Sequence, residues 1–287
     1  MSENRKEKRA VELLVLSDVH LGTVGCNAKE LLKYLKSIQP KKVVLNGDII
    51  DIWQFKKKYW PKSHMKIIKY IVGWVSKGVE VIYITGNHDE MLRKFAGFQM
   101  GSLSIENKAV LELDGKKAWF FHGDVFDVTM QHSKWLAKMG AVGYDFLIVM
   151  NCAVNTIRKS FGFERVSFSK KIKDKVKGAV KFVNNFEKVV TDISIDKNYD
   201  FVLCGHIHKP ELKKVVNEKG ETMYLNSGDW IENLTALEYH DENWRLYKYE
   251  ENEKFSNDEQ DVETIDELDQ SSKEVFENML KEFNLMK

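Results

Sequence analysis

The sequence predicts an α/β fold built around a mostly parallel β-sheet. Between residues 12 and 89, short apolar runs rich in branched side chains alternate with helical patterns. Alternation of this kind favours parallel strands joined by right-handed crossovers. Each apolar run also ends in a cluster of polar residues, and ligands bind beyond the carboxyl ends of the strands in such sheets. The pattern therefore predicts both the fold class and the edge where a site would lie.

Three strands and two helices are expected in this first part of the chain. The strands are ELLVLS at 12–17, KVVLNGD at 42–48 and VEVIYITGNHD at 79–89. Each begins as a short apolar run with branched residues, which is typical of a buried strand. Helical patterns at about 27–38 and 62–77 separate the strands.

Strand signals are also found in the second part of the chain. Residues 108–124 read as two strands around an Asp-Gly turn. Further strands are expected at 199–208, in a hairpin near 211–226 and in a pair near 233–249. These strands extend the same α/β domain.

The segment between these strands changes character. From about 126 to 196 the pattern is helical and lacks strong strand signals, so we expect a helical insertion or cap inside one domain. That domain covers residues 1–250. Residues 251–287 form a C-terminal tail that is acidic up to about residue 270, and a solvated tail is the default expectation for such a segment.

Composition excludes several classes of protein. The formal net charge is +1, which gives no global field toward nucleic acid or a membrane. Cys26, Cys152 and Cys204 are too few and too far apart for a disulfide framework, so they read as reduced thiols. No signal peptide is recognisable, and the apolar stretch at 141–154 is too short to span a bilayer. A cytoplasmic protein is expected, either soluble or resting on the inner membrane face.

The polar clusters after the strands share the chemistry of metal ligands. They contain carboxylates, imidazoles and one amide, a set that suits Mn, Fe or Zn as divalent ions. Two histidines spaced two residues apart at the end of a strand can face the same way. The residues are Asp18, His20, Asp48, Asp51, Asn87, His88, Asp89, His122, Asp124, His206 and His208.

Each cluster alone has an ordinary structural interpretation. A single histidine at a strand end is more often hydrogen-bonded than metal-bound, and an Asp there usually caps the next helix. Gly-Asp and Gly-Asn pairs are common turn signals. Five clusters in this order, each directly after an apolar run, favour one shared site instead.

The set of motifs resembles the calcineurin-like metallophosphoesterase family. The family signature D-x-H, G-D-x-x-D, G-N-H-D/E, a later H and G-H-x-H is matched between residues 18 and 208 by DVH, GDIID, GNHD, His122 and GHIH. The resemblance implies a four-layer α/β/β/α sandwich with two metal ions at one edge. It implies that the 1–250 domain is a metallophosphoesterase domain whose helical insertion covers about 126–196.

The resemblance also implies a role for each matched residue. The first ion would be held by Asp18, His20 and His208, and the second by Asn87, His122 and His206. Asp48 would bridge the two ions, for which Mn²⁺ is the best expectation and Fe²⁺ or Zn²⁺ are alternatives.

The expected chemistry is hydrolysis of a phosphoester. Two such ions can share a hydroxide that attacks phosphorus in line, without a covalent phospho-enzyme. His88 would assist the leaving group, with Asp51 as the carboxylate that orients it. Asp89, Asp124 and Asp127 are expected to support the ligands or to contact the substrate.

Within the family, the chain is most similar to the UDP-2,3-diacylglucosamine pyrophosphohydrolases of bacterial lipid A synthesis. The likeness rests on HGDVFD at 122–127, the insertion after it, and NSGDWIENLTALEY at 226–239. It implies a lipid-linked nucleotide substrate that is cleaved to the lipid sugar 1-phosphate and UMP. The chain departs from the group at His88, where those enzymes usually carry Arg.

The insertion has a composition that suits such a substrate. Basic residues crowd 158–181, and Arg165, Lys170 and Lys171 are the candidates for substrate contact. Apolar residues precede them, so the segment could also touch an anionic membrane surface. A solvated lysine-rich helix face is the ordinary alternative.

Three other functions stay open at this point. A general phosphodiesterase or phosphomonoesterase would use the same site on another substrate. A non-catalytic scaffold would have no need to retain the ligands. A nuclease is disfavoured because such enzymes usually present a long basic groove, whereas this chain has a net charge of +1 and a single basic segment. The oligomeric state cannot be read from the sequence.

Overall fold

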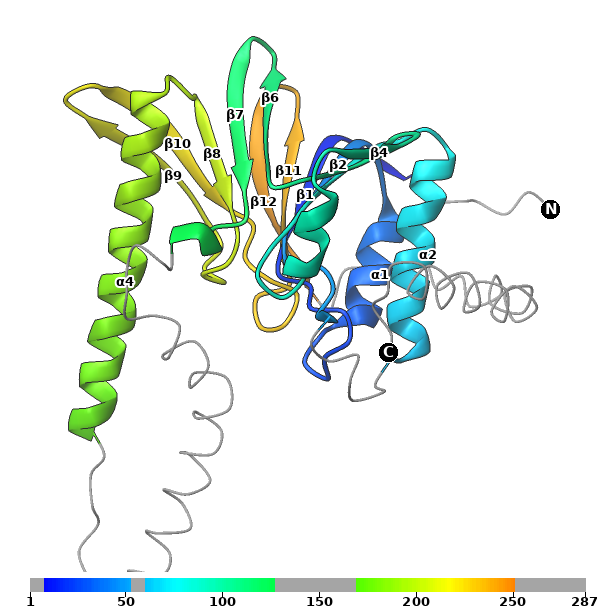
Figure 1. Ribbon diagram of the computed structural model, residues 1–287, viewed down its shortest axis with the longest axis horizontal. Helices are drawn as coiled ribbons and strands as arrows, with labels where there is room; N and C mark the ends of the chain where they lie inside the picture. The colour runs from blue at the N-terminus through cyan, green and yellow to red at the C-terminus, as the bar shows by residue number, and fades with distance from the viewer. Residues whose placement is uncertain (1–7, 53–59, 127–168, 251–287) are drawn as a thin grey trace, which may run out of the picture.

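The computed structural model describes residues 8–52, 60–126 and 169–250 (Figure 1). In this part of the chain, two β-sheets stack face to face, and helices cover their outer faces. The four-layer α/β/β/α arrangement implied by the motifs is therefore confirmed.

The first sheet has seven strands in the order β12-β11-β1-β2-β3-β5-β4. Its centre is parallel, whereas β4, β11 and β12 pair antiparallel at the two edges. The strands are β1 (Arg9–Leu16), β2 (Ile38–Asn46), β3 (Glu80–Ile84), β4 (Phe98–Met100), β5 (Leu103–Glu106), β11 (Thr235–His240) and β12 (Asn243–Lys248).

The second sheet has five strands in the order β6-β7-β8-β10-β9. The middle strands β7, β8 and β10 are parallel, and β6 and β9 pair antiparallel beside them. The strands are β6 (Lys108–Leu113), β7 (Lys116–Phe121), β8 (Phe201–Cys204), β9 (Glu211–Asn217) and β10 (Gly220–Asn226).

Three helices form the outer layers of the described structure. Helices α1 (Ala28–Ser37) and α2 (Lys62–Ser76) pack on the first sheet, and α4 (Ser169–Asp196) packs against β8 and β10 of the second. Figure 1 shows α4 on one side of the molecule and the α1–α2 pair on the other. Two short 3₁₀ helices follow the strands that end in polar motifs, η2 (Glu90–Phe95) after β3 and η3 (Asp124–Phe126) after β7.

Each layer boundary is filled by a separate apolar cluster. Leu13, Val15 and Val44 of the first sheet meet Phe120 and Leu203 of the second in the core between the sheets. Alternate residues of the same strands, such as Leu14 and Leu16, face α1 and α2 instead. Burial of both faces explains why β1 and β2 read as continuous apolar runs.

The described structure adds two strands that the sequence pattern did not predict, and it covers only part of the predicted insertion. The added strands are β4 and β5. Of the segment 126–196, residues 169–196 form α4, whereas 127–168 lie outside the described residues, as does the tail at 251–287. No helix in the described ranges is long and apolar enough to cross a membrane.

Candidate metal centre

The predicted metal ligands converge at one edge of the two sheets. They follow β1, β2 and β3 in the first sheet and β7 and β8 in the second. The residues form three overlapping groups, and within each group the candidate ligand atoms lie within 4.8 Å of one another. The groups are Asp18, His20 and His208; His20, Asp48 and His88; and Asp48, His122 and His206.

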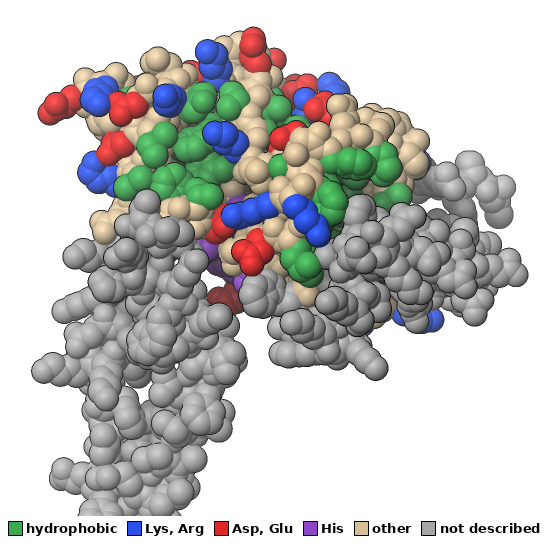
Figure 2. Space-filling model, viewed as in Figure 1, with side chains coloured by type: hydrophobic (Ala, Val, Ile, Leu, Met, Phe, Trp, Pro, Cys, Tyr) green, Lys and Arg blue, Asp and Glu red, His purple; other side chains and the backbone are tan. Residues whose placement is uncertain are grey.

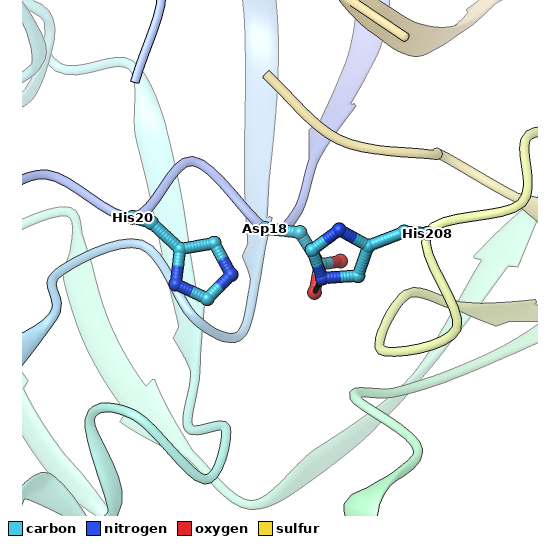
Figure 3. Close-up of side chains that lie close together, drawn as sticks. All are labelled: Asp18, His20 and His208. Atoms are coloured by element: carbon cyan, nitrogen blue, oxygen red, sulfur yellow. Dashed lines mark ion pairs between the residues drawn. The ribbon is translucent and has the colours of Figure 1, made fainter. Parts of the chain in front are cut away.

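Asp18 and Asp48 form the centre of this arrangement. The Asp18 Oδ1 atom lies 3.2 Å from His208 Nε2, and the backbone N–H of His206 donates to the same carboxylate. The Asp48 Oδ2 atom lies 3.3 Å from His122 Nε2 and 3.9 Å from His20 Nε2. Figure 3 shows His20 and His208 on opposite sides of Asp18, so that the loop after β1 and the loop after β8 face one space.

The backbone that carries these ligands is strained. Asp18, His20, Asp48, His206 and His208 all have φ between 50° and 67°. They are five of the ten non-glycine residues with positive φ in the described ranges. Such a conformation costs on the order of 1 kcal/mol or more for each residue, and strain of this kind gathers at functional sites. The fold therefore keeps the backbone of these five residues in a conformation that such residues rarely adopt on their own.

Glycines leave the space that the ligands occupy. A Cβ atom on Gly86 would lie 2.2 Å from Asp48 Oδ1, and one on Gly205 would lie 2.4 Å from Asp18 Oδ2. A Cβ atom on Gly47 would lie 2.3 Å from the His122 ring. The glycines of the GD, GN and GH motifs are thus needed to let the carboxylates and the imidazole approach closely.

Several buried polar atoms at the site lack a hydrogen-bond partner among the described residues. They include His20 Nε2, His122 Nε2 and Asn87 Oδ1. The other nitrogen of His122, Nδ1, lies 2.9 Å from the carbonyl oxygen of Asn46, so Nδ1 carries a proton and Nε2 is left to face the Asp48 carboxylate. Buried polar atoms are normally paired, so these unpaired donor atoms fit a bound cation.

The electrostatics of the site depend on attraction between the carboxylates and the imidazoles. Burial raises the pKa of Asp18, but the neighbouring His208 and His122 outweigh it and lower the pKa to about 2. Burial lowers the pKa of His208, but the Asp18 carboxylate outweighs it and raises the pKa to about 9. For His20, burial dominates and lowers the pKa to about 4. The carboxylates of Asp18 and Asp48, whose pKa values are both lowered, are therefore ionised and can bind cations. A divalent ion bound to His208 would displace the proton of its imidazole.

His88 and Asp51 form a separate pair beside the ligands. The His88 Nδ1 atom lies 3.3 Å from Asp51 Oδ2, at ion-pair distance but without hydrogen-bond geometry. Burial lowers the pKa of His88, but Asp51 and Asp48 outweigh it, and the net shift is upward. The Asp51 side chain is buried, whereas 39% of the His88 side chain is exposed. An imidazole that retains its proton and faces solvent can deliver that proton to a bound molecule.

The buried Asp89 carboxylate connects two of the loops that carry candidate ligands through hydrogen bonds. Its carboxylate accepts hydrogen bonds from the backbone N–H of Gly86, the backbone N–H of Ile49 and the hydroxyl of Tyr83. Asp89 directly precedes η2 as its N-cap residue, but its side chain makes no capping bond there. In the described residues its partners thus belong to β3 and to the GNHD and GDIID loops, and none is a histidine ring.

Asp124 contacts an arginine that the sequence analysis did not single out. The Arg93 guanidinium of η2 donates to Asp124 Oδ2. Both residues line a cavity of about 240 Å³, together with His122. The remaining predicted contacts cannot be placed: Asp127 and Arg165 lie outside the described residues, and so do the side chains of Lys170 and Lys171.

The sequence analysis did not single out two further residues that contact the site, Asn226 at the end of β10 and Asp229 in the turn after it. Asp229 is fully buried, accepts hydrogen bonds from the backbone N–H groups of Ile231 and Glu232, and lies 3.8 Å from His208 Nδ1. Asn226 donates to the carbonyl oxygen of Gly205, which precedes His206. The signal was present, since the NSGD cluster at 226–229 follows a strand as the other motifs do.

A site of this composition, at the edge of two stacked sheets, defines a class of metal-dependent phosphoester hydrolases. The sequence model of the calcineurin-like phosphoesterase family matches residues 11–210. The chain belongs to this family and is a phosphoester hydrolase that depends on divalent metal ions.

Curated relatives cover almost the same length. A UDP-2,3-diacylglucosamine hydrolase from Aliivibrio fischeri (strain MJ11) is 22% identical over 247 residues, which cover 83% of this chain and 98% of the relative. The protein of the same name from Blochmanniella pennsylvanica (strain BPEN) is 24% identical over 238 residues, covering 81% and 94%. A third, from Photorhabdus laumondii, is 25% identical and covers 70% and 84%.

Proposed function

We propose that this enzyme hydrolyses the diphosphate of UDP-2,3-diacylglucosamine and releases the lipid sugar 1-phosphate and UMP. The observation that carries the hydrolytic part is the convergence of the ligand residues from five separate loops. The support for this substrate is the name of relatives that align over most of their length at low identity.

In this proposal, each ligand residue has a place at one of two ions. Asp18, His20 and His208 hold the first ion, and Asn87, His122 and His206 hold the second. Asp48 lies between the two sets. When bound, the ions, which we propose to be Mn²⁺ with Fe²⁺ or Zn²⁺ as alternatives, would activate a water molecule and withdraw charge from the phosphoryl oxygens.

The chain itself supplies the proton for the leaving group. His88 stands at the solvent side of the site, and its carboxylate neighbours raise its pKa. Asp51 is buried behind it and orients the ring. In this assignment His88 donates to the departing oxygen, and Asp51 keeps the ring from turning away.

The lipid side of the substrate is assigned to the segment 126–196. Arg165, Lys170 and Lys171 are proposed to contact the substrate, and Asp127 to support the site. The same basic and apolar composition supports a peripheral contact with the inner face of the membrane. The cytoplasmic location follows from this contact and from the nucleotide product.

A direct assay tests the substrate assignment. The purified enzyme, loaded with Mn²⁺, is given UDP-2,3-diacylglucosamine and, separately, bis(p-nitrophenyl) phosphate. Release of UMP with a far higher kcat/KM than for the diester supports the proposal. Turnover of the diester without release of UMP overturns it and leaves a general phosphodiesterase, which the half-exposed His88 beside the buried Asp51 also suits.

A further inference from the structure

A buried histidine outside the candidate metal centre contacts the loop that carries two of the candidate ligands. His64 lies in the first turn of α2 and is 2% exposed. Its Nδ1 atom accepts a hydrogen bond of 2.9 Å from the backbone N–H of Gly22, which follows His20 by two residues in the loop after β1. Nδ1 is therefore the unprotonated nitrogen of the ring, and burial lowers the pKa of His64, which favours this neutral form.

Gly22 belongs to a tight turn that begins at His20. The backbone N–H of Thr23 donates to the carbonyl oxygen of His20 at 3.1 Å, and the Thr23 hydroxyl donates to the same oxygen at 3.0 Å. Gly22 has a φ of 105° at the third position of the turn, where a type II turn favours glycine. A Cβ atom there would lie 3.1 Å from the Trp60 ring. The turn is thus closed by its own backbone and packed against the residues at the start of α2.

The same turn is fixed on its other side by the loop after β2. The backbone N–H of His20 donates to the carbonyl oxygen of Asp48 at 2.9 Å. That of Leu21 donates to Ile49, also at 2.9 Å. These bonds join the turn to the loop of a second candidate ligand, and His64 supplies the bond from α2. The orientation of His20 relative to Asp48 therefore depends on both sets of contacts.

The burial of His64 separates it from residues that can touch a substrate. Figure 2 shows histidine side chains at the surface near the centre of this face, beside acidic and basic side chains. The side chains of His88 and His208 are 39% and 37% exposed, whereas His64 is almost fully buried. Any effect of His64 on the reaction therefore passes through the turn. Without this acceptor the buried N–H of Gly22 would lose its hydrogen bond, which is costly enough to shift the turn.

We propose that His64 is a positioning residue of the metal centre, which holds the turn of His20 in the place that the first ion requires. This assignment rests on the ligand set of the proposed function. His64 acts as a hydrogen-bond acceptor for the backbone and binds neither metal nor substrate. Residues that orient metal ligands in this way contribute to metal affinity without touching the ion.

The test measures Mn²⁺ binding to the metal-free protein by calorimetry in two variants of this position. His64→Leu removes the acceptor and should weaken Mn²⁺ binding at one site by about 10- to 100-fold, the range for residues that orient metal ligands. His64→Asn keeps an acceptor oxygen at the δ position and should bind Mn²⁺ within about threefold of the parent. In the parent, ¹⁵N NMR should show a neutral His64 ring that carries its proton on Nε2.

Ile71→Ala is the control for a general loss of stability, since Ile71 is buried further along α2. It should lower the Tm of the metal-free protein and bind Mn²⁺ like the parent. Unchanged Mn²⁺ affinity in His64→Leu would overturn the proposal, as would an equal loss in His64→Asn or in Ile71→Ala. A proton on Nδ1 of His64 in the parent would do the same.

His20→Ala distinguishes the failure of this inference from the failure of the ligand set. Weakened Mn²⁺ binding in His20→Ala together with parent-like binding in His64→Leu would refute the role of His64 alone. Parent-like binding in His20→Ala would refute the proposed ligand set, and the role of His64 with it. Loss of affinity in both variants, with recovery in His64→Asn, is the result that we expect.

Discussion

The ligand side chains and the glycines beside them depend on each other at the scale of single residues. Asp48 reaches the centre of the site because Gly86 presents no Cβ atom to its carboxylate. Asp18 has the same relation to Gly205. In each pair, the absence of a Cβ atom on the glycine is therefore what lets the carboxylate occupy its position in the site.

Gly86→Ala should cost at least about 100-fold in kcat/KM and lower the metal content, because the new methyl group must displace the Asp48 carboxylate. Gly73→Ala, in the middle of α2, is the matched control, since a Cβ atom there meets nothing within 4 Å. It should raise the free energy of unfolding by about 0.5–1 kcal/mol and leave activity unchanged. Kinetics, elemental analysis and thermal unfolding measure these effects, and full activity in Gly86→Ala would contradict the geometry.

If His88 donates a proton to the leaving group, the loss of kcat in His88→Asn should depend on how basic that leaving group is. For phosphodiesters that release a poor, strongly basic leaving group, kcat should fall by about 100-fold or more. For p-nitrophenyl esters, whose leaving group needs little protonation, the loss should be much smaller. A series of aryl and alkyl esters measures the dependence, and an equal loss across the series would remove His88 from the role of proton donor.

From the sequence, candidate ligands could be picked out where they follow an apolar strand. The structure places Asp18 beside His208 and Asp48 beside His122, and their role as metal ligands stays a prediction. Asp229 and Arg93 were missed for physical reasons. Asp229 occupies an ordinary Ser-Gly-Asp turn, and Arg93 lies on a short exposed 3₁₀ helix that has no periodic signal.

At the scale of elements, α4 is fastened to the second sheet close to the metal centre. Phe186 and Val190 pack on Phe121, Val202 and Tyr224 of the sheet. The buried Glu187 accepts hydrogen bonds from Lys209, at 3.0 Å, and from Lys213. Because Lys209 follows His208 directly, this ion pair ties the helix to the GHIH loop.

The Glu187 contact predicts a pH-dependent stability. Burial raises the pKa of Glu187, but its two lysine partners outweigh it, so the pKa lies below the ordinary value of 4.5. The stabilisation is therefore present above pH 4.5 and is lost as the pH falls through the lowered pKa. Glu187→Gln should cost about 1 kcal/mol at pH 7, and the difference from the parent should shrink in acid.

Denaturant unfolding at several pH values checks this expectation on the metal-free protein, so that metal loss in acid does not intervene. Lys188→Ala, which removes an exposed pair with Asp192 on the same helix, serves as the control. It should change stability by at most about 0.5 kcal/mol. A Glu187→Gln difference that grows as the pH falls would contradict the assigned direction of the pKa shift.

Most strands and helices were predictable because their apolar periodicity is strong. The helix pattern at 27–38 and the hairpin pattern at 211–226 correspond to α1 and to β9 with β10. Strands β4 and β5 were not predicted, because they are three and four residues long and no residue in either is buried. Their place at the sheet edge is decided by the pairing of β5 with β3 and of β4 with β5, which is a tertiary effect.

At the scale of the whole molecule, the parallel strands of the two sheets end at the same edge, so the loops that follow them lie close together. The first sheet supplies both carboxylates, and the second supplies His122, His206 and His208. Neither sheet alone holds a complete set of ligands. Stacking of the sheets through their shared apolar core thus brings the candidate ligands together.

The sequence motifs identified this architecture through their order rather than through local preference. Composition and periodicity alone indicated one mostly parallel sheet, and nothing in them separates the strands at 116–121 and 201–204 into a second sheet. That division depends on contacts between residues distant in sequence, such as the parallel pairing of Ala118 with Phe201.

The most direct test of the metal centre is a crystal structure of the Mn²⁺-loaded enzyme with anomalous scattering recorded at the manganese edge. Two peaks about 3.5–4 Å apart are predicted, with Asp48 touching both. One should be bound by Asp18, His20 and His208, and the other by Asn87, His122 and His206. A single peak, or peaks away from these residues in an active crystal, would contradict the account.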